Sequence, residues 1–207
     1  MKRQQIIFFL AGLIAGLTCV TLGSFGFLGF FESLGLLLLI VGLIYLVGPL
    51  FFVAVAMGIL ITGARRRVTG GFLRYLAGLA VSTITYIAAF LAFWGVMGNL
   101  SEWLGLPQSA NFEDFGIDVW LGFVAAGVVG ASGIALFAAV LTGKWSNSLL
   151  FRLILAGLGT IVVTFIANLP FHSYWSFFGI LLPLGNALFC CLVGTQIWRN
   201  PEEAKKN

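Results

Sequence analysis

Residues 36–67 read LLLLIVGLIYLVGPLFFVAVAMGILITGARRR, a long apolar run that ends in three consecutive arginines. Its apolar part, residues 36–62, exceeds the about 20 residues that an α-helix needs to cross roughly 30 Å of hydrocarbon. The basic run at 65–67 is typical of a short cytoplasmic loop that stops transfer across the membrane and attracts anionic headgroups. We therefore predict a transmembrane helix that ends at the cytoplasmic surface.

Five more apolar stretches of comparable length surround this one. The composition agrees, because 60% of the residues are hydrophobic and 9% are charged, whereas a soluble domain carries about a quarter charged residues. Each stretch is expected to be helical, since lipid offers no hydrogen-bond partner to an open backbone. We predict an all-α, polytopic membrane bundle: a single transmembrane domain over 1–207, with a polar cytoplasmic tail at 201–207. The six predicted spans are about 5–28, 36–62, 72–98, 118–142, 150–170 and 174–198.

The eleven lysines and arginines lie in alternate gaps between or beside these spans, or within the first three residues of an adjoining span. They are Lys2, Arg3, Arg65, Arg66, Arg67, Arg74, Lys144, Arg152, Arg199, Lys205 and Lys206. The acidic residues lie in the other gaps, except for Glu202 and Glu203 in the tail. Lysine and arginine concentrate in cytoplasmic loops, so we predict that both termini are cytoplasmic, in an inner or plasma membrane. The one dense basic run lies in a short loop against the membrane, which argues against a nucleic-acid partner.

A short motif recurs near the start of three predicted helices. The sequence Leu-Ala-Gly-Leu, with a basic residue ahead of each copy, occupies 10–13, 76–79 and 155–158. Such repeats are typical of membrane bundles built by duplication of helical hairpins. We predict three tandem hairpins, over about 1–66, 67–145 and 146–200.

Glycine is frequent, with 27 of 207 residues, and it forms ridges with alanine. Small residues recur every fourth position on the first and fourth spans, at Gly12, Gly16, Gly122, Ala126 and Gly130. Small residues let helix backbones approach closely in lipid. We interpret these ridges as packing faces within the bundle, with an oligomer seam as the alternative. The predicted partners are the lipid bilayer and either further copies of this chain or other membrane subunits.

Uncharged polar residues lie within the spans. The candidates for a pore or pocket are Tyr45, Thr85, Tyr86, Ser132, Thr164, Asn168 and Asn186. One interpretation is structural: Pro49 and Pro183 each free a backbone carbonyl inside a helix, and neighbouring hydroxyls satisfy it. The other is a neutral, hydrogen-bonding path between hairpins. Asn168 and Asn186 are its best candidates, because an amide in lipid is costly unless it is bonded.

No Asp, Glu, Lys, Arg or His falls at the middle of a predicted span. Proton pumps, carboxylate-coupled transporters and voltage sensors use such charges, so the sequence disfavours these classes. The chain shows no nucleophile–base pair, no phosphate loop and no spaced set of metal ligands. We therefore predict no enzymatic activity, no cofactor and no metal site.

Three features of the predicted outer loops could bear on function. His172, the sole histidine, is either an interfacial turn residue or an axial ligand or pH-sensitive contact. The acids Glu113, Asp114 and Asp118 form either a solvated loop or a weak cation site at a pore mouth. Asn99 opens an Asn-Leu-Ser glycosylation sequon, which matters in a eukaryotic host.

These patterns favour a channel, or the binding subunit of a transporter, for a small neutral or weakly polar solute. The alternative is a non-catalytic structural or assembly subunit of a larger membrane complex, which short loops and small-residue faces also fit. A lipid-modifying enzyme is the weakest hypothesis, because only the outer acids together with His172 supply an acid/base pair.

Overall fold

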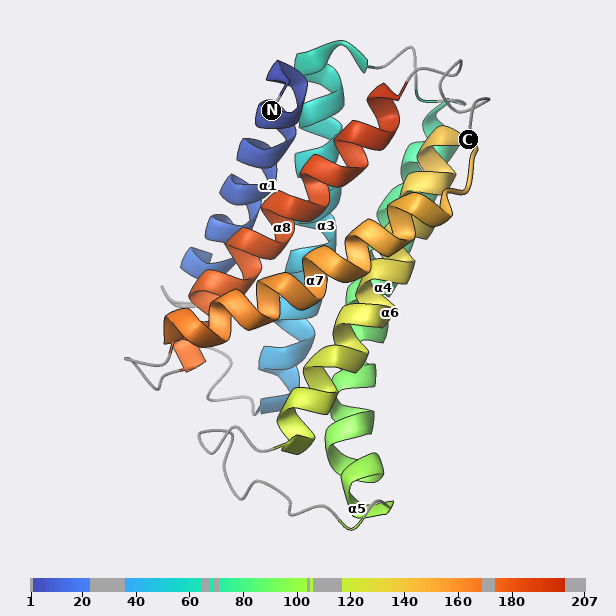
Figure 1. Ribbon diagram of the computed structural model, residues 1–207. Coiled ribbons are helices and arrows are strands. Elements are labelled where there is room, and N and C mark those ends of the chain that lie inside the picture. Colours follow the sequence, from blue (N-terminus) through green and yellow to red (C-terminus); the bar gives the residue numbers. More distant parts are fainter. Residues whose placement is uncertain are drawn as a thin grey trace.

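The computed structural model describes residues 2–22, 36–64, 68, 71–103, 105, 117–168 and 174–199 (Figure 1). Throughout these ranges the regular structure is helical, so the predicted helical bundle is confirmed. The elements are α1 (Arg3–Leu22), α3 (Leu36–Thr62), α4 (Phe72–Gly95), η3 (Val96–Leu100), α5 (Ser101–Trp103), α6 (Ile117–Thr142), α7 (Asn147–Asn168) and α8 (Tyr174–Trp198).

Five of these helices are long and apolar enough to cross a membrane. They are α1, α4 with its η3 extension, α6, α7 and α8, and α3 adds an apolar segment at Leu46–Thr62. The apolar span over α4 and η3 ends at Asn99, within a residue of the predicted end at 98, and the helix continues through α5 to Trp103. Of the first predicted span, residues 23–28 lie outside the described residues.

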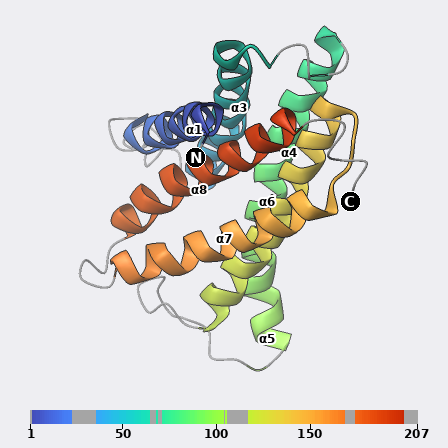
Figure 2. The same cartoon turned by 45° about the horizontal axis from the view of Figure 1, so that its top comes forward.

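The six long helices form a closed ring in the order α1, α3, α4, α6, α7 and α8, and α8 returns to α1 (Figures 1 and 2). The most extensive contact joins α1 and α8, the first and last helices of the chain. The helices of each predicted hairpin touch one another, since α1 packs on α3, α4 on α6 and α7 on α8. That pairing is what hairpins require, while their origin as repeats remains a prediction.

Glycines allow the α1–α8 contact. A Cβ on Gly12 would collide with the backbone of Asn186, and one on Gly16 would collide with the backbone of Pro183. The buried Phe8 ring fills the space that side chains at Gly58 of α3 and Gly194 of α8 would otherwise occupy. These contacts are the close approach of backbones that small residues permit in lipid.

The two ends of the bundle carry opposite charge. The described cations lie at the end where α1 begins, in the upper part of Figure 1; they are Lys2, Arg3, Arg74, Lys144, Arg152 and Arg199. The described acids, Glu102 in α5 and Asp118 in the first turn of α6, lie at the opposite end. We call these the basic end and the acidic end.

Two clusters of buried apolar side chains fill the interior. The larger one, the basic-end cluster, reaches from the middle of the bundle toward the basic end, and its largest members are Phe8, Phe51, Phe137, Ile59, Ile134, Leu141 and Leu153. The acidic-end cluster joins α4, α6 and α7 nearer the other end, through Phe93, Val119, Phe123 and Ile161. Buried polar side chains lie beside members of both clusters.

Candidate functional site

We define the polar layer as the buried polar residues near the middle of α4, α7 and α8, with Tyr86. The buried members are Ser82, Thr85, Thr160, Thr164 and Asn186. All of them are uncharged. Ser82 is next to Val81, which packs on the basic-end cluster, and Thr160 is next to Ile161 of the acidic-end cluster. These residues do not line one common surface. The Thr85 side chain lies against Gly133 in the α4–α6 contact, where a Cβ on Gly133 would overlap it.

One hydrogen bond crosses the bundle within this layer. The Tyr86 hydroxyl of α4 donates to Oδ1 of Asn186 on α8, at 2.6 Å. The two helices are not neighbours in the ring, so the bond spans its interior. Asn186 is 3% exposed, and its backbone lies against Gly12. The ring of Phe51 packs against Tyr86 with centroids 6.1 Å apart, so both partners are held by surrounding residues.

Two polar atoms of the layer are buried without a hydrogen-bond partner. They are the amide nitrogen Nδ2 of Asn186 and the hydroxyl Oγ1 of Thr164. Leaving such groups unsatisfied costs about 1–3 kcal/mol each. Asn186 is therefore anchored through its oxygen, while its two N–H donors remain available to an acceptor. A small molecule with a carbonyl or hydroxyl oxygen has the chemistry to accept from them.

The other hydroxyls of the layer bond within their own helices. Ser82, Thr85 and Thr160 donate to the carbonyls of Leu79, Val81 and Ala156, at 2.9, 2.7 and 2.7 Å. Such bonds are the local way for a serine or threonine to be satisfied inside a helix. The donors that distinguish the layer are thus those of Tyr86, Thr164 and Asn186.

The structure separates the sequence candidates into three groups. Thr85, Tyr86, Thr164 and Asn186 fall in the polar layer. Ser132 does not: it donates to the Val128 carbonyl of its own helix at 2.8 Å and lies on the same face as the exposed Val128 and Leu136. The side chains of Tyr45 and Asn168 lie outside the described residues.

The small residues predicted to pack occupy helix contacts. Gly122 is buried against Phe93, Gly130 faces Ala89, and Ala126 packs on the acidic-end cluster. These three residues lie along α6, on its side toward α4, while Gly12 and Gly16 face α8 as described above.

Two interhelical hydrogen bonds that the sequence did not predict lie at the basic end. Nε2 of Gln5 donates to Thr195 Oγ1 at 3.1 Å, linking α1 to α8. Nε1 of Trp198 donates to Thr62 Oγ1 at 3.3 Å, linking α8 to α3. The partners of the first bond are 190 positions apart in the chain, and those of the second are 136 positions apart. No local sequence pattern therefore predicts these bonds. Thr160 was also missed, although it is spaced one helical turn from Thr164.

Aromatic packing closes the other side of the polar layer. The rings of Phe93 and Phe123 have centroids 4.9 Å apart, and those of Trp120 and Phe165 have centroids 4.6 Å apart. These pairs belong to the acidic-end cluster and its neighbours. The described conformation therefore has apolar side chains on both sides of the polar layer.

Of the three acids predicted to lie in a solvated outer loop, the structure describes only Asp118. Asp118 is 2% exposed, so the structure buries it instead of leaving it in water. Its place in the first turn of α6 suits a carboxylate, since the helix dipole is positive there. Glu113, Asp114 and His172 lie outside the described residues, and Asn99 is exposed in η3. Among the described residues, no group of three His, Cys, Asp or Glu side chains is placed to hold a metal ion.

Comparison of the chain with protein-family models, with curated proteins and with solved structures finds no match. The polar layer and the membrane character of the helices are therefore the features that indicate function.

Proposed function

We propose that the protein is a channel or a transporter subunit for a small, neutral or weakly polar solute, with its basic end facing the cytoplasm. The observation that carries the proposal is the Tyr86–Asn186 hydrogen bond, which engages the Asn186 oxygen and leaves its amide donors buried and unbonded. The Thr164 hydroxyl of α7 is also buried and unbonded. Membrane proteins that move solutes bind them near the midplane. Tyr86 and Asn186 lie near the middle of α4 and α8, and Thr164 lies in the last third of α7.

The chemistry of the layer defines the solute class. Its available groups are neutral donors, and none of its residues is ionisable near neutral pH except at extreme shifts, since they are Ser, Thr, Tyr and Asn. A charged solute would be stripped of water without a counter-charge, which is costly. An amide, urea-like or polyol solute instead replaces its water by the Asn186 and Thr164 donors.

The two apolar clusters supply the barriers. Hydrophobic constrictions gate membrane pathways by excluding water. The basic-end cluster, with the Gln5–Thr195 and Trp198–Thr62 bonds, closes one side of the layer, and the acidic-end aromatics close the other. Solute passage then requires one cluster to open at a time, or both to open briefly.

A swelling assay tests this proposal. Vesicles containing the purified chain are mixed with an inward gradient of urea, acetamide, glycerol or potassium chloride, and light scattering follows their swelling. We expect at least one neutral solute to enter faster than it enters protein-free vesicles, while the salt enters both at the same rate. Equal rates for every neutral solute with and without protein would overturn the proposal.

The alternative role, as a structural subunit, makes a different prediction. Native mass spectrometry of the chain extracted in mild detergent from its own host distinguishes the two. A homo-oligomer of fixed size supports the transport proposal. Fixed stoichiometry with different chains supports the structural role.

A further inference from the structure

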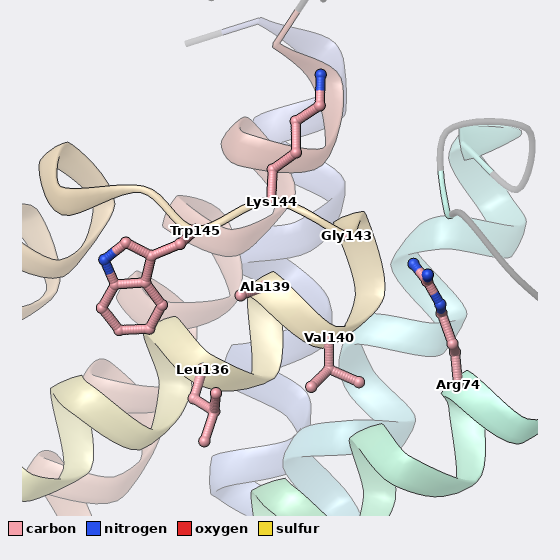
Figure 3. Close-up of a pocket in the computed structure, with 7 residues that line it drawn as sticks. All are labelled: Arg74, Leu136, Ala139, Val140, Gly143, Lys144 and Trp145. Carbon is pink, nitrogen blue, oxygen red and sulfur yellow. The ribbon is translucent and has the colours of Figure 1, made fainter.

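A second feature lies away from the polar layer, at the basic end. The start of α4, the last turn of α6 and the link into α7 surround an open depression of about 400 Å³ (Figure 3). Its lining combines two cations and an indole with an apolar floor, namely Arg74, Lys144, Trp145, Leu136, Ala139 and Val140. Arg74 comes from α4 and Lys144 from the link between α6 and α7, so the fold brings the two cations together.

The lining side chains are sorted by polarity along the bundle axis. In Figure 3, the side chains of Arg74 and Lys144 extend toward the same side, from opposite edges of the depression, while Leu136 and Val140 lie below them. Lys144 is exposed, and Leu136 is exposed on the face of α6 that also carries Ser132. The depression is thus basic at its rim and apolar toward the middle of the membrane.

Local hydrogen bonds fix the rim. Gly143 adopts a left-handed conformation with φ +70°, and its N–H donates back into the last turn of α6. The Thr142 hydroxyl donates to the Ala138 carbonyl at 2.8 Å, and the Lys144 carbonyl lies 3.2 Å from the same hydroxyl oxygen. The indole Nε1 of Trp145 donates to Asn147 Oδ1 at 2.6 Å. Lys144 and Trp145 are therefore presented by a defined turn instead of a long loop.

We propose that this depression binds an anionic phospholipid from the leaflet at the basic end of the bundle. The phosphate lies between Arg74 and Lys144, and an acyl chain runs down over Leu136 and Val140. Basic pockets between transmembrane helices bind anionic headgroups in this way, and an indole such as Trp145 is suited to headgroup depth. Both described acids lie at the opposite end, and the described charged residues at this end are all cations. The proposal is independent of any transported solute.

Native mass spectrometry with added lipid tests the site. The full chain in detergent is titrated with phosphatidylglycerol or with phosphatidylcholine of the same acyl chains, and the affinity for the first bound lipid is measured. The test variant is Arg74→Gln/Lys144→Gln. The control is Arg152→Gln, which removes an exposed cation at the same end that does not line the depression.

We expect the wild-type chain to bind phosphatidylglycerol more tightly than phosphatidylcholine. The double variant is expected to lose about fivefold in affinity per cation removed, hence about 25-fold for both. Arg152→Gln is expected to stay within about twofold of the wild type. Equal affinity for the two lipids, or an equal loss in Arg152→Gln, would overturn the proposal. So would displacement of the lipid by low-millimolar inorganic phosphate, because the site would then select a free anion.

Discussion

The Tyr86–Asn186 bond allows a quantitative test by a double-mutant cycle. Tyr86→Phe removes the donor and leaves Oδ1 of a 3%-exposed asparagine without a partner, in addition to Nδ2. Asn186→Leu keeps the branching at Cγ but leaves the tyrosine hydroxyl unbonded. Interhelical hydrogen bonds in membrane proteins average about 0.6 kcal/mol and reach about 1.7 kcal/mol. A buried group left unpaired costs about 1–3 kcal/mol. We therefore expect Tyr86→Phe to lose about 1–2 kcal/mol of unfolding free energy, and Asn186→Leu to lose less, because it also removes the buried, unbonded Nδ2.

The double variant is expected to lose much less than the sum of the two. Replacing both partners by apolar groups leaves no orphaned atom of the pair, which is nearly neutral. The assay is reversible unfolding in mixed micelles, in which a denaturing detergent is titrated against helicity for all four proteins. The cycle should yield a coupling energy of about 1–2 kcal/mol. Additivity of the two single effects to within about 0.5 kcal/mol would refute the bond.

Two further predictions concern packing and topology. Gly12→Ala should destabilise the bundle by about 1–3 kcal/mol, because its Cβ meets the backbone of Asn186 and the core resists overpacking. The matched change Gly159→Ala, with nothing within 4 Å of the new Cβ, should be neutral or stabilise by up to about 1 kcal/mol in the same unfolding assay; equal losses would contradict the close approach. A cysteine replacing Trp103, which is 81% exposed at the acidic end, should react with an impermeant maleimide on intact cells. A cysteine replacing Lys144 should react only after the membrane is permeabilised, and the reverse pattern would invert the proposed orientation.

The helices were predictable because lipid imposes them. A backbone without water has to bond within its own segment, so α3, α6 and α8 follow from hydropathy, and their observed bounds lie within a residue of the predicted ones. The helical continuation after the third span was less predictable, since η3 and α5 carry the helix through residues of mixed polarity to Trp103. Hydropathy reports whether a segment enters lipid, and it says little about how a helix frays into a loop.

The pairing of helices was beyond the sequence. A series of hairpins does not imply that the first and last helices pack most closely, yet α1 and α8 do so through Gly12 and Gly16. Tyr86 and Asn186 meet because the ring closes, although 100 positions separate them. Closure depends on the shapes of all six helices at once, so no single segment carries the signal.

The placement of Ser132 could have been anticipated. Along α6, the exposed Val128 and Leu136 lie one turn to either side of it, whereas the small residues Gly122, Ala126 and Gly130 follow a different stripe. In lipid, small residues favour helix contacts, so a hydroxyl on the large-residue stripe faces outward. The burial of Asp118 was not anticipated. Its position next to a predicted loop suggested a solvated carboxylate, whereas the fold buries it in the first turn of α6.

The most direct test compares solute uptake by variants of the polar layer with uptake by a variant of Ser132, which lies outside the layer. The rate of vesicle swelling is measured for the neutral solute that the wild-type chain passes fastest, at matched protein content, in Asn186→Leu, in Tyr86→Phe/Asn186→Leu and in Ser132→Ala. The double variant is included because it is expected to fold nearly as well as the wild type. The account predicts that both Asn186 variants swell at the protein-free rate, while Ser132→Ala swells like the wild type. Wild-type swelling in the Asn186 variants would contradict it.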